Sequence, residues 1–245
     1  MQGLEIPKII HQTWKTANLP AKWQALQRSW REYHPTWEYR LWSDAMNRDF
    51  IAQFYTWFLP IYDSYTDNIK RADAVRYFYM YHFGGVYADL DLQCLRPLEG
   101  LLEGKELVMG WEPAAHISRY ASEHRGLKHL ICNAFLASGP AHPFWEHVFK
   151  HLVESKDAIA VLDSTGPLML TRAYDSYADI RNLTIVQSDL LYPMSLQESR
   201  DKAFKIDQIR GLEKAYAIHY WSSSWFREAA LKAVRRRIVE SRNKK

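Results

Sequence analysis

One segment constrains the fold more than any other: a helical stretch that runs through two glycines into a short strand carrying two aspartates. Its pattern predicts a helix over residues 67–83, which Gly84 and Gly85 end because glycine adopts the left-handed backbone conformation without steric cost. The alternation after them predicts a strand over residues 86–92, on which Asp89 and Asp91 point to the same face. Two carboxylates on one face repel each other unless a cation lies between them. This strand therefore predicts a site for a divalent metal that carries a phosphorylated ligand.

The rest of the chain alternates in the same way between helical and strand patterns. Further helices are expected over residues 22–33, 46–55, 143–154 and 166–177, and further strands over 7–14, 39–42, 106–111, 133–138, 183–188 and 216–220. The polar run 113–126 has no periodicity and predicts a long surface loop of the kind that often forms a lid. Strands that alternate with helices predict an α/β fold with a mainly parallel central sheet flanked by helices.

The residues around the glycine pair resemble the DXD core of glycosyltransferase family 32. The resemblance rests on a spacing, Asp73-x-x-Arg76-Tyr77 followed by Gly84-Gly85-x-Tyr87-x-Asp89-x-Asp91, that is far more specific than a lone Asp-x-Asp. Residues 6–14 and 35–44 also match the family, so that the resemblance covers roughly residues 5–225. The family includes fungal α-mannosyltransferases and bacterial capsule-type transferases, and the same core resembles the glucosylating domain of large bacterial toxins. The resemblance implies a GT-A fold and metal-dependent, retaining transfer of a hexose from a nucleotide sugar, UDP- or GDP-linked, to a glycan or lipid-linked acceptor.

The resemblance also implies roles for the residues of the core. Asp73 and Arg76, which share a helix face, would contact the donor sugar, and Arg76 would donate to the glycosidic phosphate oxygen. The alternative for this pair is a solvated ion pair within the helix. Asp89 would contact the ribose and the metal, Asp91 would bind Mn²⁺ or Mg²⁺ directly, and His219 would complete the metal shell. A structural histidine at a strand end is the alternative for His219.

Five further residues match donor-contacting positions of the family. Trp14 would stack on the nucleotide base, and Asn133 would lie near the transferred sugar. Ser224 and Trp225 would close over the pyrophosphate. Tyr87 would approach the donor. Core packing for the tryptophans and a strand-edge hydrogen bond for Asn133 are the alternatives.

The sequence leaves the chemistry open at two points. No motif identifies a carboxylate nucleophile of the kind that retaining glycosidases use, so attack on the face from which the phosphate departs is the alternative. A metal-dependent phosphoryl-transfer enzyme and a non-catalytic sugar- or membrane-binding module are the rival functions. Phosphatases with an Asp-x-Asp motif need Thr or Val soon afterwards, whereas Leu92 and Gln93 follow here. A binding module would have no need of the Asp73–Arg76 pair together with the metal pair.

Charge is concentrated at the C-terminal end. Residues 226–245 hold eight Lys or Arg and two Glu, a net charge of +6, so the other 225 residues carry −2. We therefore expect a catalytic domain over residues 1–225, which is no nucleic-acid binder, and a basic C-terminal helix over 226–245. That helix would contact an anionic membrane surface or, alternatively, pack against the domain.

Cysteine use and hydropathy indicate the compartment. Cys94 and Cys132 lie in apolar runs without metal or disulfide spacing, so we expect buried free thiols in a reducing compartment. Residues 1–7 lack an apolar core, and the longest apolar stretch, 50–62, is too short to span a bilayer. The expected location is cytoplasmic, with peripheral contact at the inner face of the membrane.

Overall fold

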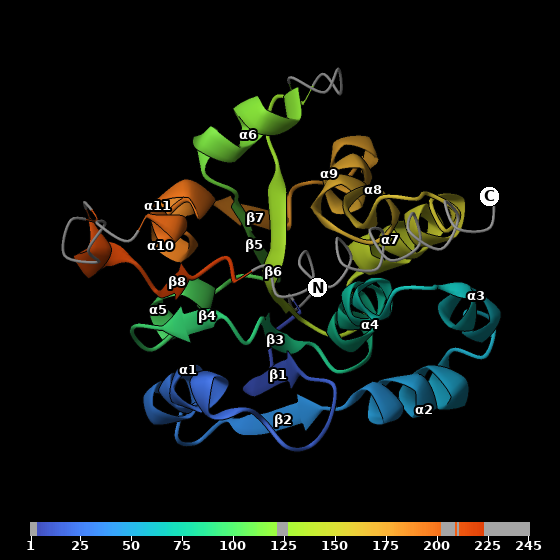
Figure 1. Cartoon of the computed structure of the whole chain (residues 1–245), viewed down its shortest axis with the longest axis horizontal. Coiled ribbons are helices and arrows are strands. Elements are labelled where there is room, and N and C mark those ends of the chain that lie inside the picture. The colour runs from blue at the N-terminus through green and yellow to red at the C-terminus, as the bar shows by residue number, and fades with distance from the viewer. Residues whose placement is uncertain (1–3, 122–126, 202–208, 210, 223–245) are drawn as a thin grey trace, which may run out of the picture.

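The computed structural model describes residues 4–121, 127–201, 209 and 211–222, and its centre is a six-stranded sheet (Figure 1). The strands lie in the order β2-β1-β3-β6-β5-β7. Their bounds are β1 Ile9–Thr13, β2 Glu38–Trp42, β3 Gly85–Ala88, β5 Leu107–Trp111, β6 Ile131–Ser138 and β7 Leu183–Val186. Within this sheet β6 runs antiparallel to both of its neighbours, and every other pairing is parallel. The predicted mainly parallel α/β fold is confirmed.

Helices cover both faces of the sheet (Figure 1). One face packs against α4 Asn68–His82, α7 Pro143–Glu154 and α9 Pro167–Ser176, with α2 Asp44–Phe54, α3 Leu59–Ser64 and α8 Val161–Ser164 beside them. The other face packs against α1 Ala21–Tyr33, α5 Glu99–Leu102 and α10 Ser188–Leu191. On that side β4 Leu92–Cys94 and β8 Ala217–His219 form a small antiparallel sheet. The remaining described helices are α6 Ala114–Ala121, α11 Leu196–Arg200 and the 3₁₀ turn Leu212–Lys214.

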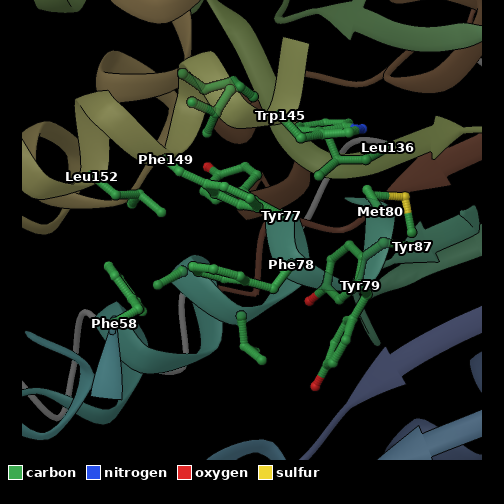
Figure 2. Close-up of a cluster of buried hydrophobic side chains, with 14 of the residues drawn as sticks. Phe58, Tyr77, Phe78, Tyr79, Met80, Tyr87, Leu136, Trp145, Phe149 and Leu152 are labelled. Carbon is green, nitrogen blue, oxygen red and sulfur yellow. The ribbon is translucent and has the colours of Figure 1, made fainter. Parts of the chain in front are cut away.

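Helix α4 is buried around most of its circumference, because it lies between the sheet and α7. Tyr77 and Phe78 of α4 pack toward Trp145 and Phe149 of α7, in a cluster of aromatic and aliphatic side chains that also contains Met80 (Figure 2). The rings of Phe78 and Phe149 stack with their centroids 4.2 Å apart. This packing fixes the orientation of α4 and therefore of the polar side chains at its N-terminal half.

Two glycines connect α4 to β3, as the sequence predicts. Gly84 and Gly85 have φ of +65° and +85°, in the left-handed region. A Cβ at Gly84 would lie 2.6 Å from the carbonyl oxygen of Ser138, and one at Gly85 would lie 2.5 Å from that of Ile9. The close approach therefore excludes larger residues at both positions.

The prediction of a single strand over residues 86–92 is wrong. β3 ends at Ala88, and residues 89–91 form a turn in which the Leu92 N–H donates to the carbonyl of Asp89 at 3.0 Å. β4 then begins at Leu92 and enters the second sheet by pairing with β8. A turn between two sheets, rather than alternation along one strand, therefore brings the two aspartates together.

Three other expectations have different outcomes. The prediction of a loop over residues 113–126 is wrong for its first part, because helix α6 forms there. At the start of this helix the His116 N–H donates to the carbonyl of Pro113 at 2.9 Å. Cys94 and Cys132 are buried free thiols, as expected. Residues 226–245 lie outside the described residues, so the two-part division of the chain stays a prediction. Among the described helices, none combines the length and the apolar character that crossing a bilayer requires.

Candidate active site

A cavity of about 910 Å³ opens where β1, β3 and β5 end. Parallel strands present their carboxyl ends at one edge of a sheet, which is where α/β proteins bind ligands. Eight of the predicted site residues line this cavity: Trp14, Asp73, Arg76, Tyr87, Asp89, Asp91, Asn133 and His219. Ser224 and Trp225 lie outside the described residues.

Arg76 connects three parts of the cavity wall. Its Nη2 lies 2.7 Å from Asp73 Oδ1 and 3.4 Å from Asp89 Oδ1, and its Nη1 donates to the carbonyl of Asn133 at 2.7 Å. The side chains of Arg76 and Asp73 are 3% and 8% exposed. The alternative of a solvated ion pair is therefore wrong. Burial raises the pKa of Asp73, and the Arg76 guanidinium opposes that rise.

Tyr87 and Asn133 complete this network. The Tyr87 hydroxyl donates to Asp89 Oδ1 at 2.6 Å. Asn133 lies on β6 where its register with β5 shifts, and its Nδ2 donates to Asp73 Oδ1 at 3.3 Å. Asn133 is therefore not a strand-edge residue, since β6 is an interior strand of the sheet.

Asp89, Asp91 and His219 offer ligand atoms that all lie within 4.8 Å of one another. His219 Nε2 is 3.0 Å from Asp91 Oδ1, and the Ser222 N–H donates to Asp91 Oδ2 at 2.8 Å. Burial alone would raise the pKa of Asp91, but His219 and the Ser222 N–H outweigh it and lower that pKa to about 2. For His219, burial lowers the pKa, but the Asp91 carboxylate beside it leaves that pKa above its usual value.

This donor set fits a divalent cation. Two carboxylates and an imidazole suit Mn²⁺ or Mg²⁺ in a site that also admits phosphate oxygens. The Nδ1 atom of His219 is buried and has no hydrogen-bond partner within the described part of the chain. The ring therefore retains a nitrogen that no described protein group uses, which is consistent with a ligand role.

Trp14 lines the cavity at the end of β1. Its indole is only partly buried and meets Trp23 of α1 edge to face, with ring centroids 6.1 Å apart. Trp14 is not a fully buried core residue, because part of its ring faces the cavity. This wall therefore offers an aromatic surface on which a base could stack.

The sequence prediction missed three cavity residues at the opposite end. Glu112 follows β5 directly, and His116 Nδ1 lies 2.8 Å from its Oε2. Trp221 lies two residues past His219 and packs against the His116 and His219 rings, with centroids 4.5 and 4.1 Å away. Trp221 has φ of +47°, unusual for a residue with a side chain. A carboxylate directly after a predicted strand was the one signal that could have identified Glu112.

Comparison with known proteins gives consistent matches. Residues 20–108 match the family model described as "Glycosyltransferase sugar-binding region containing DXD motif". Over 177 residues the chain is 38% identical to inositol phosphoceramide mannosyltransferase 2 of Schizosaccharomyces pombe, covering 70% of this chain and 47% of that protein. Mannosyl phosphorylinositol ceramide synthase CSH1 of Saccharomyces cerevisiae is 37% identical over 177 residues, with 70% and 43% covered. The chain thus spans about half the length of these curated relatives.

Solved structures confirm the predicted GT-A-type fold. The PaToxG glycosyltransferase superposes with a TM-score of 0.52 at 16% identity, covering 69% of this chain and 68% of that one. The galactosyltransferase LgtC, solved with donor and acceptor sugar analogues, superposes with a TM-score of 0.51 at 12% identity, covering 88% of each chain. At these identities the likeness concerns the fold alone.

Proposed function

We propose that this chain, whose residues 20–108 match a glycosyltransferase sugar-binding region containing a DXD motif, is a metal-dependent, retaining glycosyltransferase that uses a nucleotide-sugar donor. One observation carries this proposal: Arg76 links Asp73, Asp89 and Asn133. These residues lie in the same cavity as the Asp89–Asp91–His219 cluster. One half of this arrangement suits a sugar with its glycosidic phosphate. The other half suits a metal with its pyrophosphate.

The donor would lie along the cavity from Trp14 to Asn133. Trp14 would stack on the base, and Asp73 would accept hydrogen bonds from sugar hydroxyls. Arg76 would donate to the phosphate oxygen on which charge develops as the glycosidic bond breaks. Because Arg76 is held on three sides by protein acceptors, it is oriented before the donor arrives, and little reorganisation accompanies the reaction.

Asp89, Asp91 and His219 are the residues that would hold the metal. A divalent cation bound there would neutralise the leaving nucleoside diphosphate as a Lewis acid. For retention, we propose that the acceptor attacks the sugar from the face from which the phosphate departs. The Asp73 carboxylate is already engaged by Arg76 and Asn133, so we do not assign it the role of a nucleophile.

The acceptor class is proposed from the relatives. Their names assign them mannosyl transfer to inositol phosphoceramide, a lipid that carries a polyol head group. For this chain we propose a glycan or lipid-linked acceptor. Contact of residues 226–245 with an anionic membrane surface and a cytoplasmic location stay predictions.

Metal removal and Asp91→Asn test this proposal. Excess chelator should abolish release of nucleoside diphosphate from a panel of nucleotide sugars, and added Mn²⁺ should restore it. Asp91→Asn should lower that rate by about 100-fold or more. A neutral amide is a poor metal ligand, so the charge on the departing nucleoside diphosphate would not be neutralised. The thermal unfolding midpoint should shift by only a few degrees, because Asn still accepts from the Ser222 N–H.

Asp63→Asn is the matched control, since Asp63 forms a surface ion pair with Arg48. It should leave the rate unchanged. Full activity in excess chelator would refute the metal role. Release of inorganic phosphate or of a nucleoside monophosphate, in place of the diphosphate, would favour the rival phosphoryl-transfer function.

A further inference from the structure

Glu112 is a buried carboxylate that the proposed donor site does not use. It is the first residue after β5, where its N–H donates to the carbonyl of Leu130 at 2.7 Å. Its side chain is 6% exposed, yet it lines the cavity. A buried carboxylate needs partners, because burial without them costs several kcal/mol.

His116 supplies one partner and is itself fixed. The Leu196 N–H, at the start of α11, donates to His116 Nε2 at 2.8 Å. Because Nε2 accepts that bond, the ring proton lies on Nδ1, which donates to Glu112 Oε2 at 2.8 Å. Within the described residues the Glu112 carboxylate has no other hydrogen bond, so it retains unused acceptor capacity toward the cavity.

The sheet order places Glu112 at the far end of the cavity from Trp14. Trp14 follows β1, Asp89 follows β3, Asn133 lies on β6 and Glu112 follows β5, and these strands are successive neighbours. Three strand spacings of about 4.8 Å put β5 about 14 Å from β1. A donor that extends from Trp14 past Asp89 to Asn133 would therefore end before it reaches Glu112.

Trp221 connects the Glu112 end with the metal cluster. Its indole contacts the rings of both His219 and His116, and Nε1 donates to the carbonyl of Met194 at 2.6 Å. A flat aromatic surface beside a carboxylate is the combination that binds a sugar-like ring, whose C–H face packs on the indole while its hydroxyls donate to the carboxylate.

We propose that Glu112 forms the acceptor subsite, with His116 as the residue that positions it, and that it binds a polyhydroxylated ring, either a sugar or a cyclitol. This inference rests on the proposed function, because the donor must occupy the Trp14 end. Glu112 accepts hydrogen bonds from ring hydroxyls and holds one of them toward the transferred sugar. His116 acts through Glu112 and does not touch the acceptor.

Direct binding tests the subsite independently of catalysis. Saturation-transfer NMR on the full chain would measure the binding of methyl α-mannopyranoside and, in a second arm, of myo-inositol, with and without nucleoside diphosphate and Mg²⁺. Glu112→Gln keeps an acceptor for His116 but removes the charge, and it should weaken binding of the preferred polyol about tenfold or more. Glu198→Gln is the matched control, since Glu198 caps α11 outside this cavity and glutamine preserves the cap.

Donor hydrolysis without acceptor separates this inference from the proposed function. In Glu112→Gln the acceleration of nucleoside diphosphate release by polyol should be lost, whereas Glu198→Gln should retain it. Equal polyol binding by wild type and Glu112→Gln, or no binding of either polyol by the wild type, would overturn the subsite. A parallel fall of water-only release in Glu112→Gln would also overturn it, since Glu112 would then serve the donor. Failure of wild-type protein to release nucleoside diphosphate from any donor would instead refute the proposed function.

Discussion

Arg76 is the residue through which α4 joins the rest of the cavity. Its guanidinium contacts Asp73 on its own helix, Asp89 in the turn after β3, and the backbone of Asn133 on β6. It also lies over the Tyr87 ring, 4.5 Å from the ring centroid. A planar group with donors in several fixed directions meets all of these partners at once.

Arg76→Lys should therefore be severe despite the conserved charge. A lysine ammonium is a single point charge and cannot reach Asp73, Asp89 and the Asn133 carbonyl together. We expect kcat/KM for the donor to fall about 100-fold or more, and the free energy of unfolding to fall by about 2–4 kcal/mol. Steady-state kinetics and urea unfolding measure the two effects. Arg71→Lys, on a more exposed part of α4, should change neither by much, and near-wild-type turnover by Arg76→Lys would contradict the assigned role.

At the scale of elements, the junction between α4 and β3 sets the position of Asp89. Gly85→Ala would place a Cβ 2.5 Å from the carbonyl oxygen of Ile9 in a left-handed conformation. We expect a loss of about 3 kcal/mol or more, because backbone strain and the clash add. Gly104→Ala is the control, since its φ is +67° but a Cβ there meets nothing within 4 Å. It should cost only about 1 kcal/mol. Equal losses in urea unfolding would show that the contact with β1 is unimportant.

His11 on β1 makes the same region sensitive to acid. It is fully buried, its Nδ1 accepts from Trp42 Nε1 at 3.1 Å, and its Nε2 lies 3.1 Å from the Gly84 carbonyl, so the native ring is neutral. Burial, assisted by Arg40, lowers the pKa of His11 from 6.5 to about 3. Below pH 6.5 the unfolded chain therefore binds a proton that the native protein does not, and stability falls as the pH falls toward 3.

The His11 contribution to that slope should approach about 1.4 kcal/mol per pH unit, and should vanish above pH 6.5. In His11→Gln the unfolding free energy should decrease less steeply between pH 6.5 and 4 than in wild type, whatever the offset between the two proteins. Urea unfolding at a series of pH values measures the slopes. Parallel curves for the two proteins would contradict a buried neutral His11.

The long helices could be predicted from sequence, and the shortest helices could not. The helix expected over residues 143–154 forms with those bounds, because its apolar stripe and Pro143 are local signals. Helices such as α5 and α8 span four residues each and depend on tertiary contacts, so no periodicity identifies them. The turn after Ala88 was missed because seven alternating residues look the same whether they form one strand or two.

The residues of the candidate site also fall into those that could be predicted from sequence and those that could not. The segment from Asp73 to Asp91 could be read from spacing, because one continuous stretch supplies it. Trp221, and its position beside Glu112, could not be identified, because only the sheet order and the β4–β8 pairing bring the two residues to the same cavity. At the scale of the whole molecule, one sheet edge gathers the proposed base, sugar, metal and acceptor positions from strands far apart in sequence.

The central claim is that this edge performs retaining transfer from a nucleotide sugar. The most direct measurement is a proton NMR time course of the full chain with Mg²⁺, an α-linked nucleotide sugar and a small polyol acceptor, recorded before mutarotation. The account predicts loss of the donor's anomeric signal and first appearance of an α-anomeric product signal, in step with nucleoside diphosphate. First appearance of a β-anomeric product, or no loss of any donor in the panel, would contradict it.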